Sequence, residues 1–123
     1  MRSPVLVWGF VIGLVLTGCA ASSSGYKFTA EGGPYAQRTA ADKIEVFDKG
    51  DPGGKPFVKV GRVDGDYTSN TVVLQLIDVL PQLKQKASEG GGDAIIVRQA
   101  GYEGAPSPGK AFKVIADVIR WQP

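Results

Sequence analysis

The sequence predicts a small α+β protein, a single ββαββ layer in which one helix packs on a mostly antiparallel sheet. Its 123 residues allow one domain. Alternating and β-branched apolar runs stand on both sides of a single stretch with helical spacing, which favours a helix between two pairs of strands. The 17 glycines and 8 prolines favour a turn-rich chain over a helical bundle.

The first two expected strands are short. Residues 44–48 (IEVFD) and 57–63 (FVKVGRV) alternate between the two faces of a strand, with Val58 and Val60 expected on one face and Phe57 and Val63 on the other. The Gly/Pro-rich loop between them predicts an antiparallel hairpin. Gly61 indicates a bulge or a close approach of another backbone. Residues 64–70 are expected to be a polar connection.

The expected helix covers residues 71–89, where apolar residues recur at 73, 76, 77, 80, 83 and 87. Ser69, Asn70 or Thr71 is available as its cap. Pro81 is expected to kink the helix or divide it into two pieces, because proline lacks an amide proton and clashes with the preceding turn. Three consecutive glycines, Gly90 to Gly92, end the helix.

Two more strands follow the helix. Residues 93–98 (DAIIVR) form a continuous apolar run, which predicts a strand covered on both faces. Residues 99–110 are expected to be a Gly/Pro loop. Residues 111–121 are long and β-branched and predict the last strand, which is also a candidate edge for strand addition by a partner.

The first 18 residues predict a lipoprotein signal peptide. Arg2 precedes an apolar run from Val5 to Leu16, which as a helix spans roughly 18 Å, short of a ~30 Å hydrocarbon core. The run closes with Leu16-Thr17-Gly18-Cys19, which resembles a bacterial lipobox. The resemblance implies that the Cys19 sulfur is diacylated and that the bond before it is cut. An ordinary signal peptide with a stray cysteine and a buried core cysteine are the alternatives.

Acylation of Cys19 implies that the membrane is the first partner of this protein. Two or three acyl chains hold a protein in a bilayer essentially permanently. In Gram-negative lipoproteins an aspartate after the cysteine retains the protein at the inner membrane. The resemblance together with Ala20 therefore implies the outer membrane, with the domain facing the periplasm. An envelope protein is the second class of partner that stays open.

Residues 19–42 predict a lipidated flexible tether, and residues 43–123 the folded domain. The tether sequence is rich in Ala, Ser, Gly and Thr and has no apolar period, so it buries too little surface to offset the entropy of ordering it. The alternative is a partner-binding strap that uses Tyr26, Phe28 and Tyr35.

Three stretches resemble a group of small envelope lipoproteins that includes the outer-membrane sensor of the Rcs stress response and the α/β heavy-metal-binding family. They are Val60-Gly61-Arg62-Val63, the helix end at 83–87, and residues 91–97 (GGDAIIV). The resemblance implies that Asp93 caps or anchors the turn and that Ala94 lies where strand and helix approach closely. The Rcs sensor has four disulfide-forming cysteines in its domain and this chain has none there, so the resemblance implies fold more than role.

Composition excludes several kinds of chemistry. There is no histidine and one cysteine, which excludes histidine-based catalysis, structural zinc sites and intrachain disulfides. A net charge of +2 is too balanced for a nucleic-acid footprint. Residues 50–55 (GDPGGK) lack the spacing and the Ser/Thr of a phosphate-binding loop.

Some weaker signals stay open. Residues 64–70 place oxygen ligands at alternate positions, as calcium prefers, but lack the loop glycine and the last glutamate, so a capped polar loop is favoured. Ser107 and Lys110 are near enough in sequence for Ser–Lys chemistry, without a motif. Trp121, Tyr102 and Tyr67 form either an exposed aromatic patch or, for Trp121, the cover of the core.

We therefore predict a non-catalytic binding or sensing module with Cys19 as its lipidation site. No residue is assigned a catalytic, cofactor-binding or metal-binding role, and neither a cofactor nor nucleic acid is expected. The alternative is an exported carboxylate-based metal-binding protein or a small hydrolase.

Overall fold

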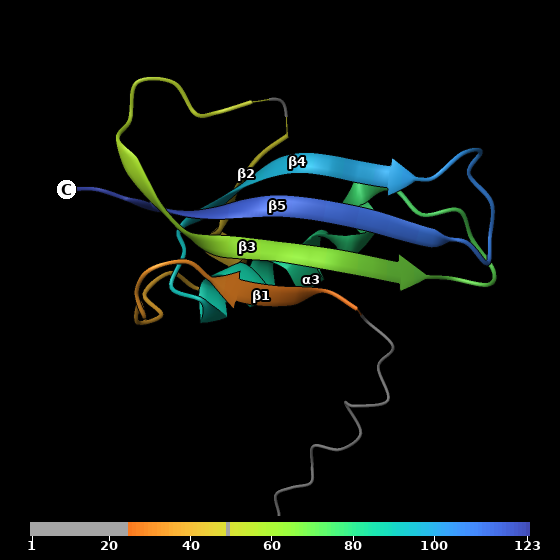
Figure 1. Cartoon of the computed structure of the whole chain (residues 1–123), viewed down its shortest axis with the longest axis horizontal. Helices are drawn as coiled ribbons and strands as arrows, with labels where there is room; N and C mark the ends of the chain where they lie inside the picture. Colours follow the sequence, from red (N-terminus) through yellow and green to blue (C-terminus); the bar gives the residue numbers. More distant parts are fainter. Residues whose placement is uncertain (1–24, 49) are drawn as a thin grey trace, which may run out of the picture.

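A computed structural model describes residues 25–48 and 50–123 and confirms the α+β class. One helix lies on one face of a five-stranded sheet whose strand order is β1-β3-β5-β4-β2 (Figure 1). The elements are β1 (Lys27–Ala30), a short 3-10 helix η3 (Ala41–Lys43), β2 (Glu45–Phe47), β3 (Phe57–Thr68), α3 (Leu76–Glu89), β4 (Ala94–Tyr102) and β5 (Ala111–Trp121). The predicted signal peptide and Cys19 lie outside the described residues.

Residues 25–42 belong to the folded domain, which corrects the expectation of a flexible tether reaching residue 42. β1 pairs antiparallel with β3, and Tyr26 is 3% exposed. The Tyr26 hydroxyl donates to the carbonyl of Phe112 at 3.0 Å. The composition of residues 25–42 did not indicate that they are folded, because a few aromatic side chains anchor the segment on a surface that the rest of the chain provides. Residues 19–24 lie outside the described part of the chain.

The expected hairpin between the first two predicted strands is wrong. β2 pairs in parallel with β4, with Glu45 opposite Ala94, and so forms the sheet edge opposite β1. β3 pairs instead with β5 over almost its whole length, because β5 has 11 residues to offer and β2 has three. β5 is therefore central, and the expectation that it is an open edge is wrong.

A bulge between Lys59 and Gly61 shifts the faces of β3. The strand alternates normally up to Val60, but beyond the bulge Val63 joins the same buried cluster as Val58 and Val60. This confirms the bulge predicted at Gly61 and corrects the expected placement of Val63 on the opposite face. The strand also continues to Thr68, so residues 64–68 are not the expected loop.

The helix begins at Leu76 and not at residue 71. The amide of Gln75 donates to Asp78 Oδ2 at 2.7 Å, so these two residues form the cap. Ser69 Oγ instead accepts the amide of Val72 at 3.3 Å and closes the preceding turn. Pro81 lies inside the helix, which continues as one element to Glu89, so the expected division is wrong. Pro81 is the sixth residue of α3, so it removes one hydrogen bond of the helix without ending it.

The sheet is covered on both faces. On one face, the helix side chains Val79, Leu83 and Ala87 pack against buried residues of β3, β4 and β5. On the other face, a smaller cluster joins buried Ala94, Ile96 and Ile119 to the rings of Phe47, Phe57 and Trp121. The prediction that the strand after the glycines is covered on both faces is confirmed, although β4 runs on to Tyr102. Ala94 belongs to the face away from the helix, which corrects the position expected for it.

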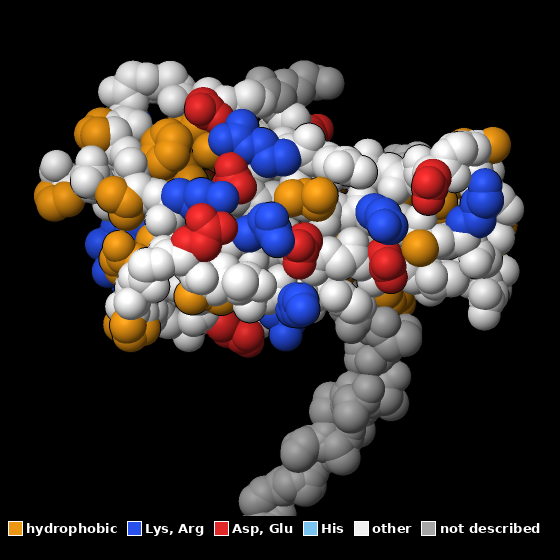
Figure 2. All heavy atoms as spheres, in the orientation of Figure 1, with side chains coloured by type: hydrophobic (Ala, Val, Ile, Leu, Met, Phe, Trp, Pro, Cys, Tyr) orange, Lys and Arg blue, Asp and Glu red, His pale blue; other side chains and the backbone are white. Residues whose placement is uncertain are grey.

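The helix-free face carries charges of both signs (Figure 2). Arg98 Nε lies 2.8 Å from Asp117 Oδ2, and Lys59 Nζ lies 3.3 Å from the other oxygen of the same carboxylate. Arg62 pairs with Asp64 at 3.1 Å. Because cations and anions alternate, this face presents no patch of a single sign.

Candidate binding site

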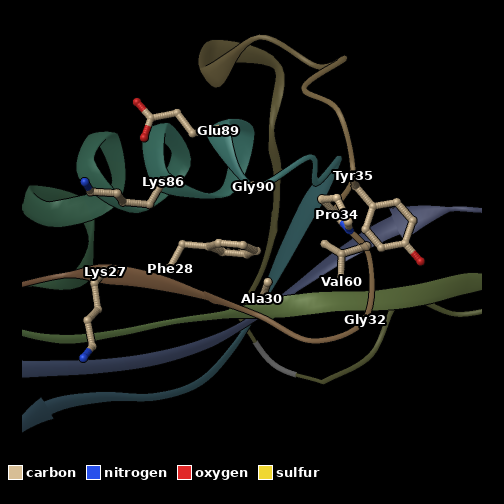
Figure 3. A pocket seen from close by; sticks show the side chains of 10 residues that line it. All are labelled: Lys27, Phe28, Ala30, Gly32, Pro34, Tyr35, Val60, Lys86, Glu89 and Gly90. Atoms are coloured by element: carbon tan, nitrogen blue, oxygen red, sulfur yellow. The ribbon is translucent and has the colours of Figure 1, made fainter.

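A groove of about 420 Å³ lies between β1 and the C-terminal end of α3 (Figure 3). Apolar groups form most of its interior, and charged groups stand at its rim. Its lining residues are Lys27, Phe28, Ala30, Gly32, Pro34, Tyr35, Val60, Lys86, Glu89 and Gly90.

Two glycines give the ring of Phe28 its place in this groove. A Cβ on Gly61 would lie 2.4 Å from Phe28 Cζ, and a Cβ on Gly90 would lie 2.5 Å from the same atom. Both distances are far inside van der Waals contact, so any larger residue would displace the ring. Gly61 and Gly90 therefore allow β1 and the helix end to approach each other through Phe28.

We expect Gly61→Ala to lower the free energy of unfolding by about 1–3 kcal/mol. The new Cβ would also meet the Thr29 carbonyl oxygen at 2.5 Å, so β1 itself must move. Urea unfolding measures the loss, and amide hydrogen exchange in β1 should quicken. Gly53→Ala is the control, because its Cβ points into open space and its stability should be unchanged or slightly raised. Unaltered stability of Gly61→Ala would contradict the β1–β3 contact.

Tyr35 forms the wall of the groove at the end opposite Lys27. The guanidinium of Arg120 lies 5.2 Å from the centre of the Tyr35 ring. Lys27, Lys86 and Glu89 supply two positive charges and one negative charge at the rim. This combination suits binding of an apolar group by contact, with polar ends held at the rim. The three aromatic residues considered for a partner-binding strap all pack on their own domain. They are Tyr26, Phe28 and Tyr35.

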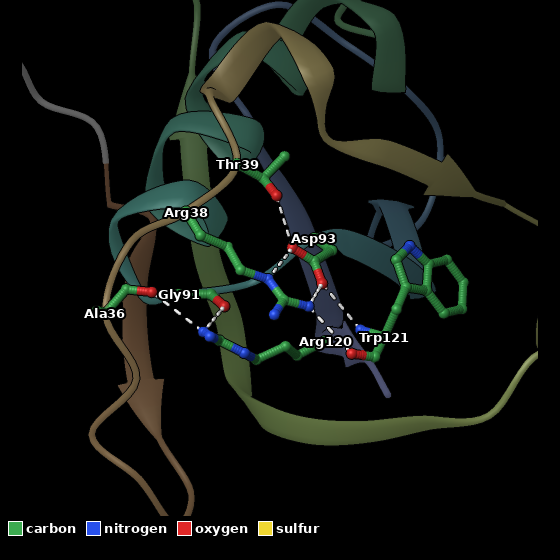
Figure 4. A network of polar contacts seen from close by, with 7 residues as sticks. All are labelled: Ala36, Arg38, Thr39, Gly91, Asp93, Arg120 and Trp121. Atoms are coloured by element: carbon green, nitrogen blue, oxygen red, sulfur yellow. Dashed lines mark hydrogen bonds and ion pairs between the residues drawn. The ribbon is translucent and has the colours of Figure 1, made fainter. Parts of the chain in front are cut away.

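A network of polar contacts surrounds Asp93 at the turn between α3 and β4 (Figure 4). Its carboxylate is 6% exposed and accepts hydrogen bonds from Arg38 Nε at 3.0 Å, from Thr39 Oγ1 at 2.6 Å and from the amide of Trp121 at 2.9 Å. Arg38 Nη2 donates to the second carboxylate oxygen. The prediction that Asp93 anchors this turn is confirmed, and the residues it holds come from both ends of the domain.

Further polar contacts hold residues 36–39 onto the fold. Arg120 donates to the carbonyls of Ala36 at 3.1 Å and Gly91 at 3.0 Å. Ser88, which is fully buried, donates to the Thr39 carbonyl at 2.6 Å. The hydrogen bonds around Asp93 thus join residues 36–39 to the helix end and to β5, which gives this centre a structural role.

The hydrogen bonds to Asp93 make the free energy of unfolding depend on pH. Burial alone would raise the pKa of Asp93, but hydrogen bonds from Arg38, Thr39 and the Trp121 amide outweigh it and hold the pKa at about 2, against an ordinary 3.8. A lowered pKa stabilises the folded state by about 2 kcal/mol above pH ~4, and this is lost as the pH falls towards ~2. Urea unfolding at a series of pH values should show the loss, and Asp93→Asn should reduce it. An equal slope in both proteins would contradict the assignment.

The weaker candidate residues are not brought together into one site. Asp64 and Asp66 lie on β3, and Asp64 is paired with Arg62. Ser107 Oγ donates to the Pro108 carbonyl at 3.1 Å, whereas Lys110 Nζ donates to the Ala105 carbonyl at 2.9 Å. Within residues 25–48 and 50–123, no three His, Cys, Asp or Glu side chains are grouped as metal ligands.

The three aromatic residues considered for a binding patch are divided between the two sides of the sheet. Tyr67 and Tyr102 pack against the helix-side cluster, and the Tyr102 hydroxyl accepts the amide of Leu74 at 2.7 Å. Trp121 lies in the other cluster, with ring centroids 6.0 Å from Phe47 and 6.2 Å from Phe57. Trp121 therefore covers the core, as one of the two interpretations predicted, and the single patch is wrong.

Comparisons with protein-family models, curated proteins and solved structures found no match to this chain. No helix in the described part of the chain is both long and apolar enough to cross a membrane. The groove was missed in the sequence because its lining comes from three separate segments. The only local signals were aromatic residues in a polar stretch and the glycine in β3.

Proposed function

We propose that this protein is a lipid-anchored envelope protein that acts by binding or sensing a partner and not by catalysis. The observation that carries the proposal is the quartet Leu16-Thr17-Gly18-Cys19 at the end of an apolar N-terminal run. A thiol preceded by small residues at that place is the substrate of acylation and cleavage in bacterial lipoproteins. Ala20 after the cysteine favours the outer membrane, with the domain on the periplasmic side.

The groove between β1 and α3 supports a binding role. It combines an apolar interior with charged rim groups, which is the usual composition of a recognition surface. The buried polar residues around Asp93 are occupied by hydrogen bonds within the chain. The described residues thus offer a place to bind, next to a polar centre that holds the fold together.

We expect radioactive palmitate to label the wild-type protein. The Cys19→Ala variant should carry no label, because the sulfur is the site of acylation. The same variant should be lost from the outer-membrane fraction, since acyl chains supply the attachment there. Ser22→Ala, three residues away, is the matched control and should keep its label. Density-gradient separation of the two membranes checks the outer-membrane location. An unlabelled wild-type protein would rule out the anchor.

A further inference from the structure

Three apolar side chains stand in water close together in sequence. Val72 is 51% exposed, Val73 is 46% exposed and Ile77 is 70% exposed. They flank Leu74, which is buried, and occupy the turn that leads into α3 and its first residues. We call these three residues the apolar tip. A scattered exposed hydrophobic residue is ordinary, but here three large apolar side chains are exposed within six consecutive residues.

The apolar tip lies at the end of the sheet where the chain enters the fold. The amide of Gly25, the first described residue, donates to the Asp66 carbonyl at 3.0 Å, two residues before β3 ends. Tyr26 reaches Phe112, the Phe112 ring packs edge-on against Tyr102, and the Tyr102 hydroxyl holds the amide of Leu74. A short series of contacts therefore joins the entry point to the centre of the apolar tip.

Only five residues separate Cys19 from Gly25. Covalent geometry limits the span from Cys19 to Gly25 to roughly 20 Å, at about 3.3–3.6 Å per residue. The 11 residues of β5 alone extend over roughly 35 Å. A link shorter than the domain keeps the entry end of the sheet beside whatever surface holds Cys19.

From these two observations we propose that the apolar tip rests on the phospholipid bilayer that holds the acyl chains of Cys19. This inference depends on the proposed lipid anchor and adds an orientation to it. The domain then stands with the ends of β3 and β4 towards the lipid, and the loop between β2 and β3 points away into the periplasm.

Charge at this end does not favour or oppose the contact. Lys27, Lys110 and Lys113 are present there together with Asp66, Asp78 and Glu103. The two signs balance, so apolar contact decides which surface meets the lipid. The bilayer is the occupant that the short link guarantees to be within reach, whereas a protein partner would have to be recruited.

The test places a fluorophore at the apolar tip of the full-length mature, acylated protein. Acylated Cys19 carries a thioether and no free thiol, so a cysteine introduced by Val72→Cys or Ile77→Cys is the sole reactive group. Each variant is labelled with a nitrobenzoxadiazole dye and reconstituted into vesicles of phosphatidylethanolamine and phosphatidylglycerol, with or without spin-labelled phosphatidylcholine. Gly53→Cys in the β2–β3 loop is the control, because it is exposed, its added Cβ meets no neighbour, and it lies at the far end of the sheet.

We expect the spin label to reduce the fluorescence at positions 72 and 77 by about twofold and to leave position 53 unchanged, since only a side chain at the lipid surface meets the quencher. Equal quenching at all three positions, or none at 72 and 77 in protein that floats with the vesicles, overturns the orientation while the anchor stands. In the second case the apolar tip is left for a protein partner. Protein that carries no acyl chain and does not float removes the anchor itself, and the orientation with it.

Discussion

Replacing Asp93 by alanine is expected to lower the free energy of unfolding by about 3–5 kcal/mol. The carboxylate is almost fully buried, and its removal leaves the Arg38 guanidinium, the Thr39 hydroxyl and the Trp121 amide without their acceptor. A small domain is stable by only about 5–15 kcal/mol, so this change removes a large part of the total. Equilibrium urea unfolding followed by circular dichroism measures it.

The same variant should show where the loss is located. Amide exchange should quicken at Trp121 and in residues 36–39, which Asp93 holds together, before it quickens in the centre of the sheet. Asp42→Ala is the matched control, because Asp42 is an exposed carboxylate in the same part of the chain. Its stability should stay within about 0.5 kcal/mol of the wild type. A loss in Asp42→Ala as large as in Asp93→Ala would contradict a specific role for the buried carboxylate.

Leu83→Ala is expected to cost about 2–5 kcal/mol, because it leaves a cavity between α3 and the sheet. Leu83 has no exposed surface and is among the largest fully buried side chains of the described residues. It lies in the helix-side cluster with Val79 and Ala87, so its methyl groups join the helix to the strands. The midpoint of urea unfolding should fall without a change in slope.

Gln85→Ala gives the comparison for Leu83→Ala. Gln85 is on the exposed side of the same helix, and its side-chain amide donates to Glu89 at 2.7 Å. Its loss should change the stability by no more than about 0.5 kcal/mol. Similar effects of the two substitutions would show that helix propensity, and not burial against the sheet, controls the stability of this region.

The groove lies next to the point at which the domain is attached to Cys19. The groove and the link to Cys19 share β1, since Lys27 and Phe28 line the groove and Gly25 begins the described chain. A ligand in the groove would therefore contact the strand through which the domain is attached. The proposed binding role and the proposed orientation meet at the same edge of the sheet.

Patterns within one segment were sufficient for much of the fold. The long β-branched run at 111–121, the apolar run after the three glycines and the helical spacing up to Glu89 all gave the right element. Each of these signals is a periodicity of one continuous stretch, and burial against a single neighbouring layer explains it. The bulge at Gly61 was also predicted, because a glycine inside a strand has few other uses.

The candidate site was beyond such patterns. Arg38 and Asp93 are separated by 55 residues, and a carboxylate after three glycines carries no mark of its partner. β1 has four residues in a polar stretch, and it is a strand only because it pairs with the edge of β3. Similarly, the groove exists only where β1, β3 and α3 meet.

Local order along the chain was therefore enough to establish the α+β class, most of the strands and the cysteine proposed to carry the lipid. The neighbours of each strand, the fate of residues 25–42 and the position of the apolar tip at the same end of the sheet as Gly25 were decided by contacts between distant segments. β3 joined β5 because a strand gains hydrogen bonds in proportion to the length of its partner, and β2 had only three residues to give. Periodicity reports which face of a segment is buried, but not which part of the chain buries it.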